Sequence, residues 1–466
     1  MLLKSPENRQ RGQAIMLVAI TLVGLIAMIG LLIDGGAVFI QSSRLKRAID
    51  AAAVAAALQF REGYSDADIA AAAQEFILLN EGETYDIEVF LCNETEFATN
   101  PAYEHADLCT TPRRKLVRIR GTNDLVFNFL PIIGIDGTSI TSDSVGEAAS
   151  VDVVIVIDAS LSMADLTDGI AGPGPGDDPA LCNFNHDCQP FEDIKNVAKD
   201  FIDTLFFPYD RVAVVTFERS PHLATYGGTS WQQSRSDARN LIDSLIVFQP
   251  ETCDFPNHTP AIGPCLNRPD GINYVGQGCV PWTDSTTSPK NPTSCTSSNI
   301  GGGLVTAGNQ FAQAPIREDS LWVVILLAGG PANATDPVAG FPYGACPESA
   351  WAQPLCRDDD AASRHAIGAL DYDGDDYARD MADFIVDPFT GQGAVIYSIG
   401  LGDKVQNDRI RGTDGDPDIA EQFLEYAATR AGGVNDQGIY YYAPNAAELR
   451  DVFRSIAENI ATRISQ

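Results

Sequence analysis

An aspartate and two serines at alternating positions, Asp158, Ser160 and Ser162, directly follow an apolar run of the chain. That run, VDVVIVID (151–158), is almost purely β-branched, which predicts a strand buried on both faces of a parallel sheet. Ligands of such sheets bind outside the carboxyl ends of the strands. Carboxylate and hydroxyl oxygens are the ligands that hard divalent cations prefer. The motif therefore predicts a metal site, and the structural alternative is that it caps a helix and closes a turn.

The sequence around this motif alternates between strand and helix patterns. Strands are expected at 151–158, 211–217, 320–328, 393–401 and 438–443, and helices at 191–206, 232–247, 299–313, 377–386, 417–431 and 445–464. This alternation predicts an α/β domain at 151–466 with a doubly wound, mostly parallel sheet. Two long insertions, at 164–190 and 249–297, interrupt the pattern and are rich in Gly, Pro, Asp and Cys.

Residues 151–464 resemble the von Willebrand factor A domain family, whose fold is Rossmann-like. The family's metal-ion-dependent adhesion site combines a DxSxS motif with a Thr from a second loop and an Asp from a third. Asp158, Ser160 and Ser162 match the first of these three elements. The resemblance implies Mg²⁺ as the ion, with Mn²⁺ and Ca²⁺ as alternatives, and a protein partner whose acidic side chain completes the coordination.

The other two elements depart from the family pattern. SNIGGGL (298–304) is similar to the second loop, with Ser298 where the family has Thr, so a hydroxyl is retained. VILLAGGPAN (324–333) is similar to the third loop, but Gly329 stands where the family has Asp. Loss of a partner outside the first coordination shell typically weakens metal binding by about 10–100-fold. We therefore expect metal binding at Asp158, Ser160, Ser162 and Ser298 to be weak or absent.

The amino-terminal part contains a long uncharged segment. Ala14–Ile33 comprises twenty residues without a charge, which at 1.5 Å per residue spans the roughly 30 Å core of a bilayer. A cleaved signal peptide is the main alternative, but its apolar region is normally about 7–15 residues long. A buried core helix is the other alternative. The pattern favours an uncleaved transmembrane helix at 14–33, with a cytoplasmic segment at 1–13.

The ten cysteines decide the orientation, because the basic residues on the two sides of the span are nearly balanced. All ten follow the span, and they form sequence-adjacent couples in loop-like stretches: 92/109, 182/188, 253/265, 279/295 and 346/356. No CxxC occurs, so a zinc site is poorly supported. Local disulfides in an extracytoplasmic domain are expected; free buried thiols in a cytosolic protein are the alternative.

Residues 34–150 are expected to form an Ala-rich helix followed by a small α+β stalk. The helix continues to about residue 60, with Ala48, Ala52 and Ala56 on one face, where small residues permit close packing. A second helix is expected at 65–79, strands at 85–91 and 115–121, and a final segment at 125–148 completes the unit.

Residues 11–58 also resemble a family, namely the amino-terminal segment of TadG-type Tad/Flp pilus-assembly proteins. The resemblance rests on Gly12 before the span, Asp34-Gly35 after it and the helix LKRAIDAA (45–52). Leu17 stands where cleaved relatives have a Glu, so no prepilin cleavage is expected. Many proteins of this family carry a von Willebrand A domain, so both resemblances imply one architecture, located in the bacterial cytoplasmic membrane as a single-pass protein.

Charge and motifs exclude other classes of function. The chain has a net charge of −32, divided into +4 for residues 1–61 and −36 for the remainder, which argues against a nucleic-acid partner. No GxSxG, HExxH, P-loop or strand-linked GxGxxG motif occurs, so the chain is not expected to be an enzyme. Two acidic stretches, 371–376 and 414–418, resemble parts of calcium loops but are better explained as acidic surface turns and a helix start.

These observations converge on a membrane-anchored extracytoplasmic protein of a Tad/Flp-type pilus-assembly system. It is expected to bind a protein partner through an A domain with a degenerate metal-ion-dependent adhesion site. A metal-independent structural scaffold or surface adhesin of the cell envelope is the alternative.

Overall fold

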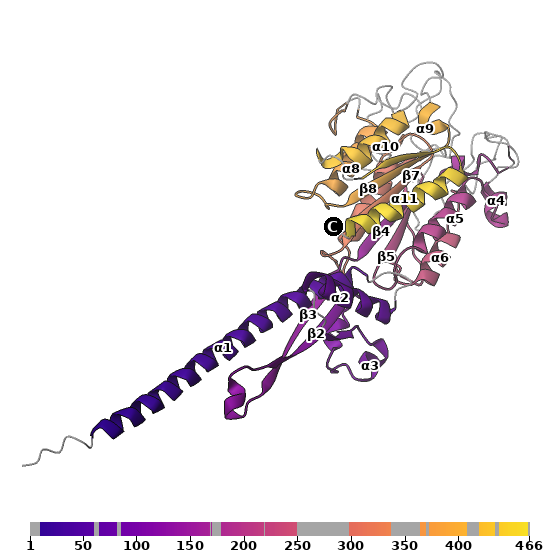
Figure 1. Cartoon of the computed structure of the whole chain (residues 1–466). Coiled ribbons are helices and arrows are strands. Elements are labelled where there is room, and N and C mark those ends of the chain that lie inside the picture. Colours follow the sequence, from indigo (N-terminus) through magenta and orange to yellow (C-terminus); the bar gives the residue numbers. More distant parts are fainter. Residues whose placement is uncertain are drawn as a thin grey trace, which may run out of the picture. The chain divides into compact units, whose positions relative to one another are not determined.

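The computed structural model describes residues 10–59, 65–81, 85–167, 169, 179–218, 220–248, 298–336, 364–369, 372–407, 419–433 and 438–464 (Figure 1). The chain divides into two compact units, Met1–Ala148 and Ala149–Gln466. Each unit has its own sheet, so each is described separately.

The first unit consists of a very long helix and a small antiparallel sheet. Its elements are α1 (Gln10–Ala57), α2 (Asp66–Glu81), β1 (Asp86–Phe90), α3 (Glu94–Thr99), β2 (Lys115–Val126) and β3 (Gly137–Ala148), with the strands in the order β1-β2-β3. A short 3₁₀ turn, η2 (Leu130–Ile133), lies at the tip of the β2–β3 hairpin. The expected transmembrane span and the expected Ala-rich helix are thus parts of one continuous helix, α1.

The Ala-rich face of α1 packs against the sheet of its own unit. Ala52, Ala53 and Ala56 are fully buried. Gly146 of β3 lies so close to α1 that a Cβ atom there would be 2.0 Å from the carbonyl oxygen of Ala53. Small residues on both elements therefore allow a close helix–sheet contact, which is the packing role that their spacing suggested.

The apolar part of α1 is exposed. All side chains from Ile15 to Ile29 are exposed, which a buried core helix does not show. Among the described residues, α1 is the one helix long and apolar enough to cross a membrane, by length and composition.

The second unit is a doubly wound α/β domain, which confirms the predicted fold class. Its strands are β4 (Val151–Asp158), β5 (Arg211–Phe217), β6 (Pro221–Leu223), β7 (Leu321–Ala328), β8 (Val395–Leu401) and β9 (Tyr440–Ala443), in the order β6-β5-β4-β7-β8-β9. All neighbouring strands are parallel except the short edge strand β6. β4 is central and every residue in it is buried, as its β-branched sequence predicts.

Helices cover both faces of this sheet, and each face has its own apolar core. The larger helices are α5 (Phe191–Ile202), α6 (Arg235–Asp243), α7 (Ile300–Phe311), α8 (Gly374–Val386), α10 (Ile419–Thr429) and α11 (Ala446–Ile464). Helices α5, α6 and α11 pack on one face, and α7, α8 and α10 pack on the other (Figure 1). The short helices α4 (Pro179–Asn185) and α9 (Lys404–Asn407) complete the described part.

A buried ion pair joins the amino ends of the central strands. Arg211 donates to Asp152 at 2.8 Å, and both side chains are fully buried. Arg317 lies 3.1 Å from the other oxygen of Asp152. The Arg211 guanidinium also lies over the ring of Trp231, 4.2 Å from its centroid. Two cations and an aromatic face thus surround one buried carboxylate.

Several details differ from the sequence predictions. The helix expected at 232–247 is shorter, because Ser234 caps α6 and the chain leaves the helix after Asp243. The expected strand 115–121 extends to Val126, so part of the predicted 125–148 segment belongs to β2 and the tip. Strand β6 and helix α4 were not predicted, since segments this short carry little periodicity.

Two of the predicted disulfides are confirmed. Cys92 is bonded to Cys109, and Cys182 to Cys188. The couples 253/265, 279/295 and 346/356 lie outside the described residues, as do the insertion at 249–297 and the acidic stretch at 414–418.

Candidate metal site and adjoining pocket

Asp158 is the last residue of β4, and its carboxylate is fully buried. One oxygen accepts the backbone N–H of Ser160 at 2.9 Å, and the other accepts the N–H of Gly329, after β7, at 3.1 Å. Burial raises the pKa of the Asp158 carboxyl, and the hydrogen bonds from Ser160 and Gly329 partly oppose this effect. Asp158 therefore joins the carboxyl ends of two neighbouring strands in addition to offering a negative charge.

The hydroxyls of Ser160 and Ser162 lie together just beyond Asp158. Their Oγ atoms are 2.9 Å apart. Ser160 precedes the 3₁₀ turn η3 (Leu161–Ala164), but its side chain makes no capping hydrogen bond there. The Asp158 carboxylate closes the turn between β4 and Ser160, as the structural alternative proposed, whereas η3 itself is closed by the N–H of Met163, which donates to the Ser160 carbonyl. Two neutral oxygens beside a carboxylate are donors of the kind that Mg²⁺ prefers.

Ser298 lies in a second loop at the carboxyl edge of the sheet. Its N–H donates to the side-chain oxygen of Asn333 at 2.6 Å, and the N–H of Asn333 donates back to its carbonyl at 3.1 Å. The next residue, Asn299, caps α7 by accepting the N–H of Gly302 and donates its own N–H to the Glu218 carbonyl after β5. These contacts connect the second loop to the ends of β5 and β7. A role for the Ser298 hydroxyl in a metal shell stays a prediction.

Sequence reasoning missed Asn333 and Asn299, which fix this loop. For Asn299 the sequence contained a signal, because an Asn directly before a helical pattern is a typical N-cap. For Asn333, only its position just after a buried strand pointed to this edge of the sheet.

Gly329 occupies the third-loop position, and the space beside it is filled. A Cβ atom on Gly329 would lie 2.3 Å from the terminal methyl of Met163 and 3.8 Å from a carboxylate oxygen of Asp158. Met163 is buried. A thioether therefore takes the place into which a side chain at position 329 would extend.

A lysine lies near the site and reduces its negative potential. Lys404, at the start of α9, forms an ion pair with Asp165 at 2.8 Å. Its charge also acts on Asp158, where it favours the ionised form and lowers the pKa. Since Gly329 contributes no charge, Asp158 is the one acidic group that the three matched elements supply. The donor set fits a weakly held divalent cation, with one carboxylate and two adjacent hydroxyls.

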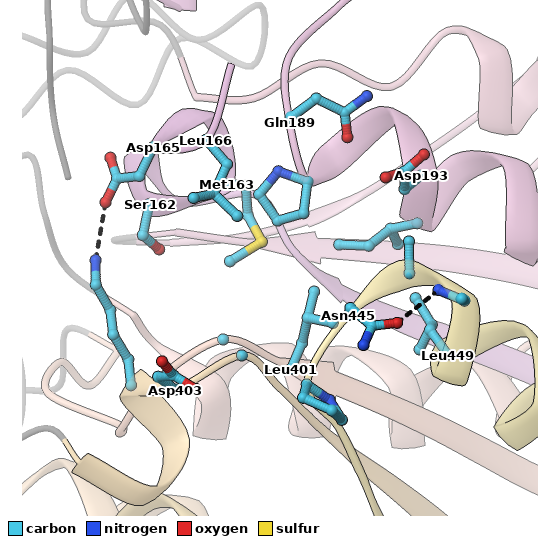
Figure 2. Close-up of a pocket in the computed structure, with 18 residues that line it drawn as sticks. Ser162, Met163, Asp165, Leu166, Gln189, Asp193, Leu401, Asp403, Asn445 and Leu449 are labelled. Carbon is cyan, nitrogen blue, oxygen red and sulfur yellow. Dashed lines mark hydrogen bonds and ion pairs between the residues drawn. The ribbon is translucent and has the colours of Figure 1, made fainter. Parts of the chain in front are cut away.

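A cavity of about 650 Å³ adjoins these residues at the carboxyl edge of the sheet (Figure 2). Its walls are largely apolar, and the polar groups lie at its margin. The lining comprises Ser162, Met163, Asp165, Leu166, Gln189, Pro190, Asp193, Ile194, Gly329, Leu401, Gly402, Asp403, Lys404, Pro444, Asn445, Ala446, Ala447 and Leu449. Ser162 and Gly329 thus belong both to the candidate metal site and to the pocket. A volume of this size is in the range of sites that take a small ligand or a protruding side chain.

The described part of the acidic stretch, residues 372–376, forms a helix start instead of a calcium loop. Asp373 caps α8 and forms a capping box with Asp376. Asp373, Asp375 and Asp376 lie close enough to share a metal ion, the one such cluster among the described residues. However, Asp375 is paired with Arg379, and His365 contacts Asp376. The predicted helix start is confirmed, but the expectation of a surface turn was wrong because all three side chains are buried.

The comparison with protein families agrees with the amino-terminal resemblance. Residues 12–59 match the family model described as "Putative Flp pilus-assembly TadE/G-like". A search of the curated proteins finds no match.

Similar solved structures include the von Willebrand factor domain of the type V pili tip protein Mfa5 from Porphyromonas gingivalis (16% identity, 68% of this chain and 97% of that chain, TM-score 0.36). A variant of the PilB minor pilin from Streptococcus sanguinis matches at 13% identity (82% and 79%, TM-score 0.38). Proximal thread matrix protein 1 from the mussel byssus, with zinc in its adhesion-site motif, matches at 13% identity (66% and 48%, TM-score 0.33). The chain spans about half the length of the first structures that it matches.

The second unit is a six-stranded sheet with one antiparallel edge strand, and its DxSxS motif follows the central strand. The chain thus combines a TadE/G-like amino-terminal segment with a doubly wound α/β domain that resembles von Willebrand A domains.

Proposed function

We propose that this chain is a membrane-anchored, extracytoplasmic protein of a Tad/Flp-type pilus-assembly system. Its A domain binds a protein partner at the carboxyl edge of the sheet, and it acts by binding, without catalysis. The match of residues 12–59 supports the pathway. The observation that carries the binding role is the pair of serine hydroxyls, 2.9 Å apart, beside the buried carboxylate of Asp158, with Ser162 lining the pocket.

Each residue of the site has a distinct task in this proposal. Asp158 holds the two loops together and supplies the negative charge, while the buried Ser160 and the partly exposed Ser162 supply neutral oxygens beside it. A divalent cation, when bound there, supplies a Lewis-acidic point for an acidic side chain of the partner. The apolar walls of the pocket then exclude water from the contact, which strengthens its electrostatics.

Calorimetric titration of the detergent-solubilised full chain with Mg²⁺ tests the metal. Removing both hydroxyls together (Ser160→Ala with Ser162→Ala) should abolish the binding heat while the thermal unfolding temperature changes little. Ser455→Ala is the matched control, since it removes an exposed hydroxyl that bonds only a helix carbonyl. Equal heats for wild type and the double variant would refute the site.

Partner binding is tested by a photo-crosslinking amino acid at the pocket margin, introduced in place of Asp193 in cells. Crosslinks to a pilus-assembly component should appear and should be lost in the variant that lacks both serine hydroxyls. Crosslinks that persist unchanged in that variant would remove the hydroxyl pair from the mechanism.

A second candidate is a metal-independent scaffold or surface adhesin of the envelope. The observation that favours it is the filled space at Gly329, where Met163 replaces a third-loop side chain. If Mg²⁺ produces no heat at millimolar concentration and the crosslinks persist, the scaffold role is the correct one.

The proposed location is the bacterial cytoplasmic membrane, with α1 crossing it once and the A domain outside the cytoplasm. The exposed apolar side chains of α1 and the two described disulfides support this arrangement. Protease added outside intact spheroplasts should degrade the A domain. Full protection of the A domain would contradict the orientation.

A further inference from the structure

The tip of the β2–β3 hairpin is strongly apolar and exposed. Its sequence, Leu125–Ile135, contains one polar side chain, Asn128, and no charge. We refer to residues 125–135 as the apolar tip. Val126 is 77% exposed, Ile132 79% and Ile133 68%, and Phe129 and Ile135 are exposed as well. Turns that face water are normally built from polar residues, so an exposed apolar turn indicates a contact surface.

Asp34 of α1 fixes the apolar tip to the helix. Its carboxylate is buried and accepts three consecutive backbone N–H groups, those of Asn128 at 3.0 Å, Phe129 at 2.9 Å and Leu130 at 2.7 Å. One turn earlier on α1, a Cβ atom on Gly30 would lie 2.7 Å from the Cβ of Phe129. The tip is therefore in close contact with α1 between residues 30 and 34.

This contact lies at the end of the uncharged segment of α1, between Gly30 inside it and Asp34 just after it. That segment ends at Ile33, and Gly30 is the first buried residue of α1 among those whose side chains are described. The sheet thus follows α1 from Ala53, beside Gly146, down to Gly30. Counted from Ile33 back to Gly30, the apolar tip lies beside about the last turn, roughly 5 Å, of the uncharged segment.

Most backbone N–H groups of the apolar tip are hydrogen-bonded within the protein. The N–H groups of Phe127, Ile132, Gly134 and Ile135 donate to carbonyls of the tip or of Asp136, and those of residues 128–130 donate to Asp34. An unbonded backbone polar group costs several kcal/mol in lipid, so the internal bonding of these N–H groups lowers the cost of moving the tip into the outer part of a bilayer. A solvent-facing loop has no such cost, since water can bond its backbone.

We propose that the apolar tip inserts into the outer part of the lipid bilayer beside α1. The inference rests on α1 crossing a membrane, as proposed above. The occupant is lipid because the tip is continuous with the exposed apolar surface of α1 at the same level. Asp124 and Asp136 border the tip and no basic residue lies within it, so insertion depends on apolar contact and does not require anionic headgroups. Interfacial segments of this kind penetrate about 5–10 Å.

Fluorescence quenching in nanodiscs that hold one copy of the full chain tests this insertion. A single environment-sensitive fluorescent amino acid is placed at position 132, with position 22 of the span as the control for the anchor and the exposed Thr95 as the control for water. Quenchers attached to phosphatidylcholine acyl chains and iodide in water are then compared.

Insertion predicts that the label at 132 is quenched by the lipid-borne group and protected from iodide, in neutral as well as anionic discs. Quenching at 22 together with iodide access at 132 would overturn the insertion while leaving the anchor intact. Absence of lipid quenching at 22 would instead overturn the anchor, and the insertion with it. A label at 132 that neither quencher reaches would show that protein covers the tip, and would also overturn the proposal.

Charged substitutions provide a second measurement on the same discs. With the label at position 135, the pair Ile132→Asp and Ile133→Asp should shift quenching from the lipid-borne group to iodide. Val145→Asp is the matched control, because Val145 is an exposed apolar residue on β3 of the same hairpin, outside the tip. Unchanged lipid quenching in the tip variant would contradict the role of its apolar side chains.

Discussion

Restoring a carboxylate at position 329 should strengthen metal binding only when Met163 is shortened as well. A Cβ atom on Gly329 would lie 2.3 Å from the Met163 methyl, far inside contact distance. Gly329→Asp alone must therefore displace a buried side chain, and overpacking of this kind costs typically about 1–3 kcal/mol. Met163→Ala opens the space, which is continuous with the adjoining pocket.

The expected gain in metal affinity follows from the charge of the new carboxylate. The new carboxylate would extend from a point 3.8 Å from the Asp158 oxygen, and two like charges about 4 Å apart at a partly buried site repel by about 4 kcal/mol. A divalent cation removes this repulsion, so the Met163→Ala, Gly329→Asp protein should be less stable without metal and should depend on it. Regaining a lost partner of this kind typically increases metal affinity by about 10–100-fold.

Calorimetry and thermal unfolding with increasing Mg²⁺ provide the two readouts. At metal concentrations near 100 times the dissociation constant, binding should stabilise the double variant by about 2.7 kcal/mol. Met163→Ala alone should show no gain in affinity, and Gly329→Asp alone should show a smaller gain than the pair. If the double variant binds Mg²⁺ no more tightly than Met163→Ala, the third loop does not contribute to a metal site and our reasoning fails. A full gain from Gly329→Asp alone would refute the role assigned to Met163.

Three further predictions concern other parts of the chain. Asp152→Asn should lower the free energy of unfolding by about 3–5 kcal/mol, because it leaves the buried Arg211 without its counter-charge; urea unfolding measures the change, and a loss below about 1 kcal/mol would contradict it. Burial raises the pKa of Asp376 from 3.8 to about 6, so the native state retains a proton that the unfolded chain has released between these pH values. The stability that this carboxyl contributes is thus present at low pH and lost as pH rises through about 6, and Asp376→Asn should remove that slope from unfolding measurements repeated across the range. Asp34→Ala should speed hydrogen exchange at the amides of residues 128–130, whose N–H groups donate to Asp34. Unchanged protection of these amides would contradict the contact between Asp34 and the apolar tip.

The sequence was sufficient for the fold because its strongest signals are periodic. The β-branched run of β4 can be buried on both faces only in a sheet covered by helices on each side, and the structure has that arrangement. Strand order and the edge strand β6 could not be predicted, since three residues carry no usable period and order depends on contacts between distant segments.

The site was only partly predictable for a similar reason. Asp158, Ser160 and Ser162 are neighbours in sequence, so their spacing alone placed them together. The substitution at Gly329 was visible in the sequence, but its consequence depends on Met163, which reaches it across the ends of β4 and β7. The contact of Asp34 with the apolar tip joins residues more than ninety positions apart, and no local pattern indicates it.

The two roles of Asp158 determine which substitution can test the site. Its carboxylate accepts hydrogen bonds from the buried N–H groups of Ser160 and Gly329. These hydrogen bonds connect the ends of β4 and β7 with or without a cation. Asp158→Ala leaves both donors without an acceptor, which costs about 1–3 kcal/mol for each, so loss of partner binding could reflect a displaced loop. Removing the hydroxyls of Ser160 and Ser162 together takes away both members of their mutual contact and one further hydrogen bond, from the Ser160 hydroxyl to Asp158, so the expected loss of stability is only about 0.5–1.5 kcal/mol. A variant without these hydroxyls that stays folded and still binds its partner would exclude the hydroxyl pair from binding, whereas a folded variant that loses binding would assign the function to that pair.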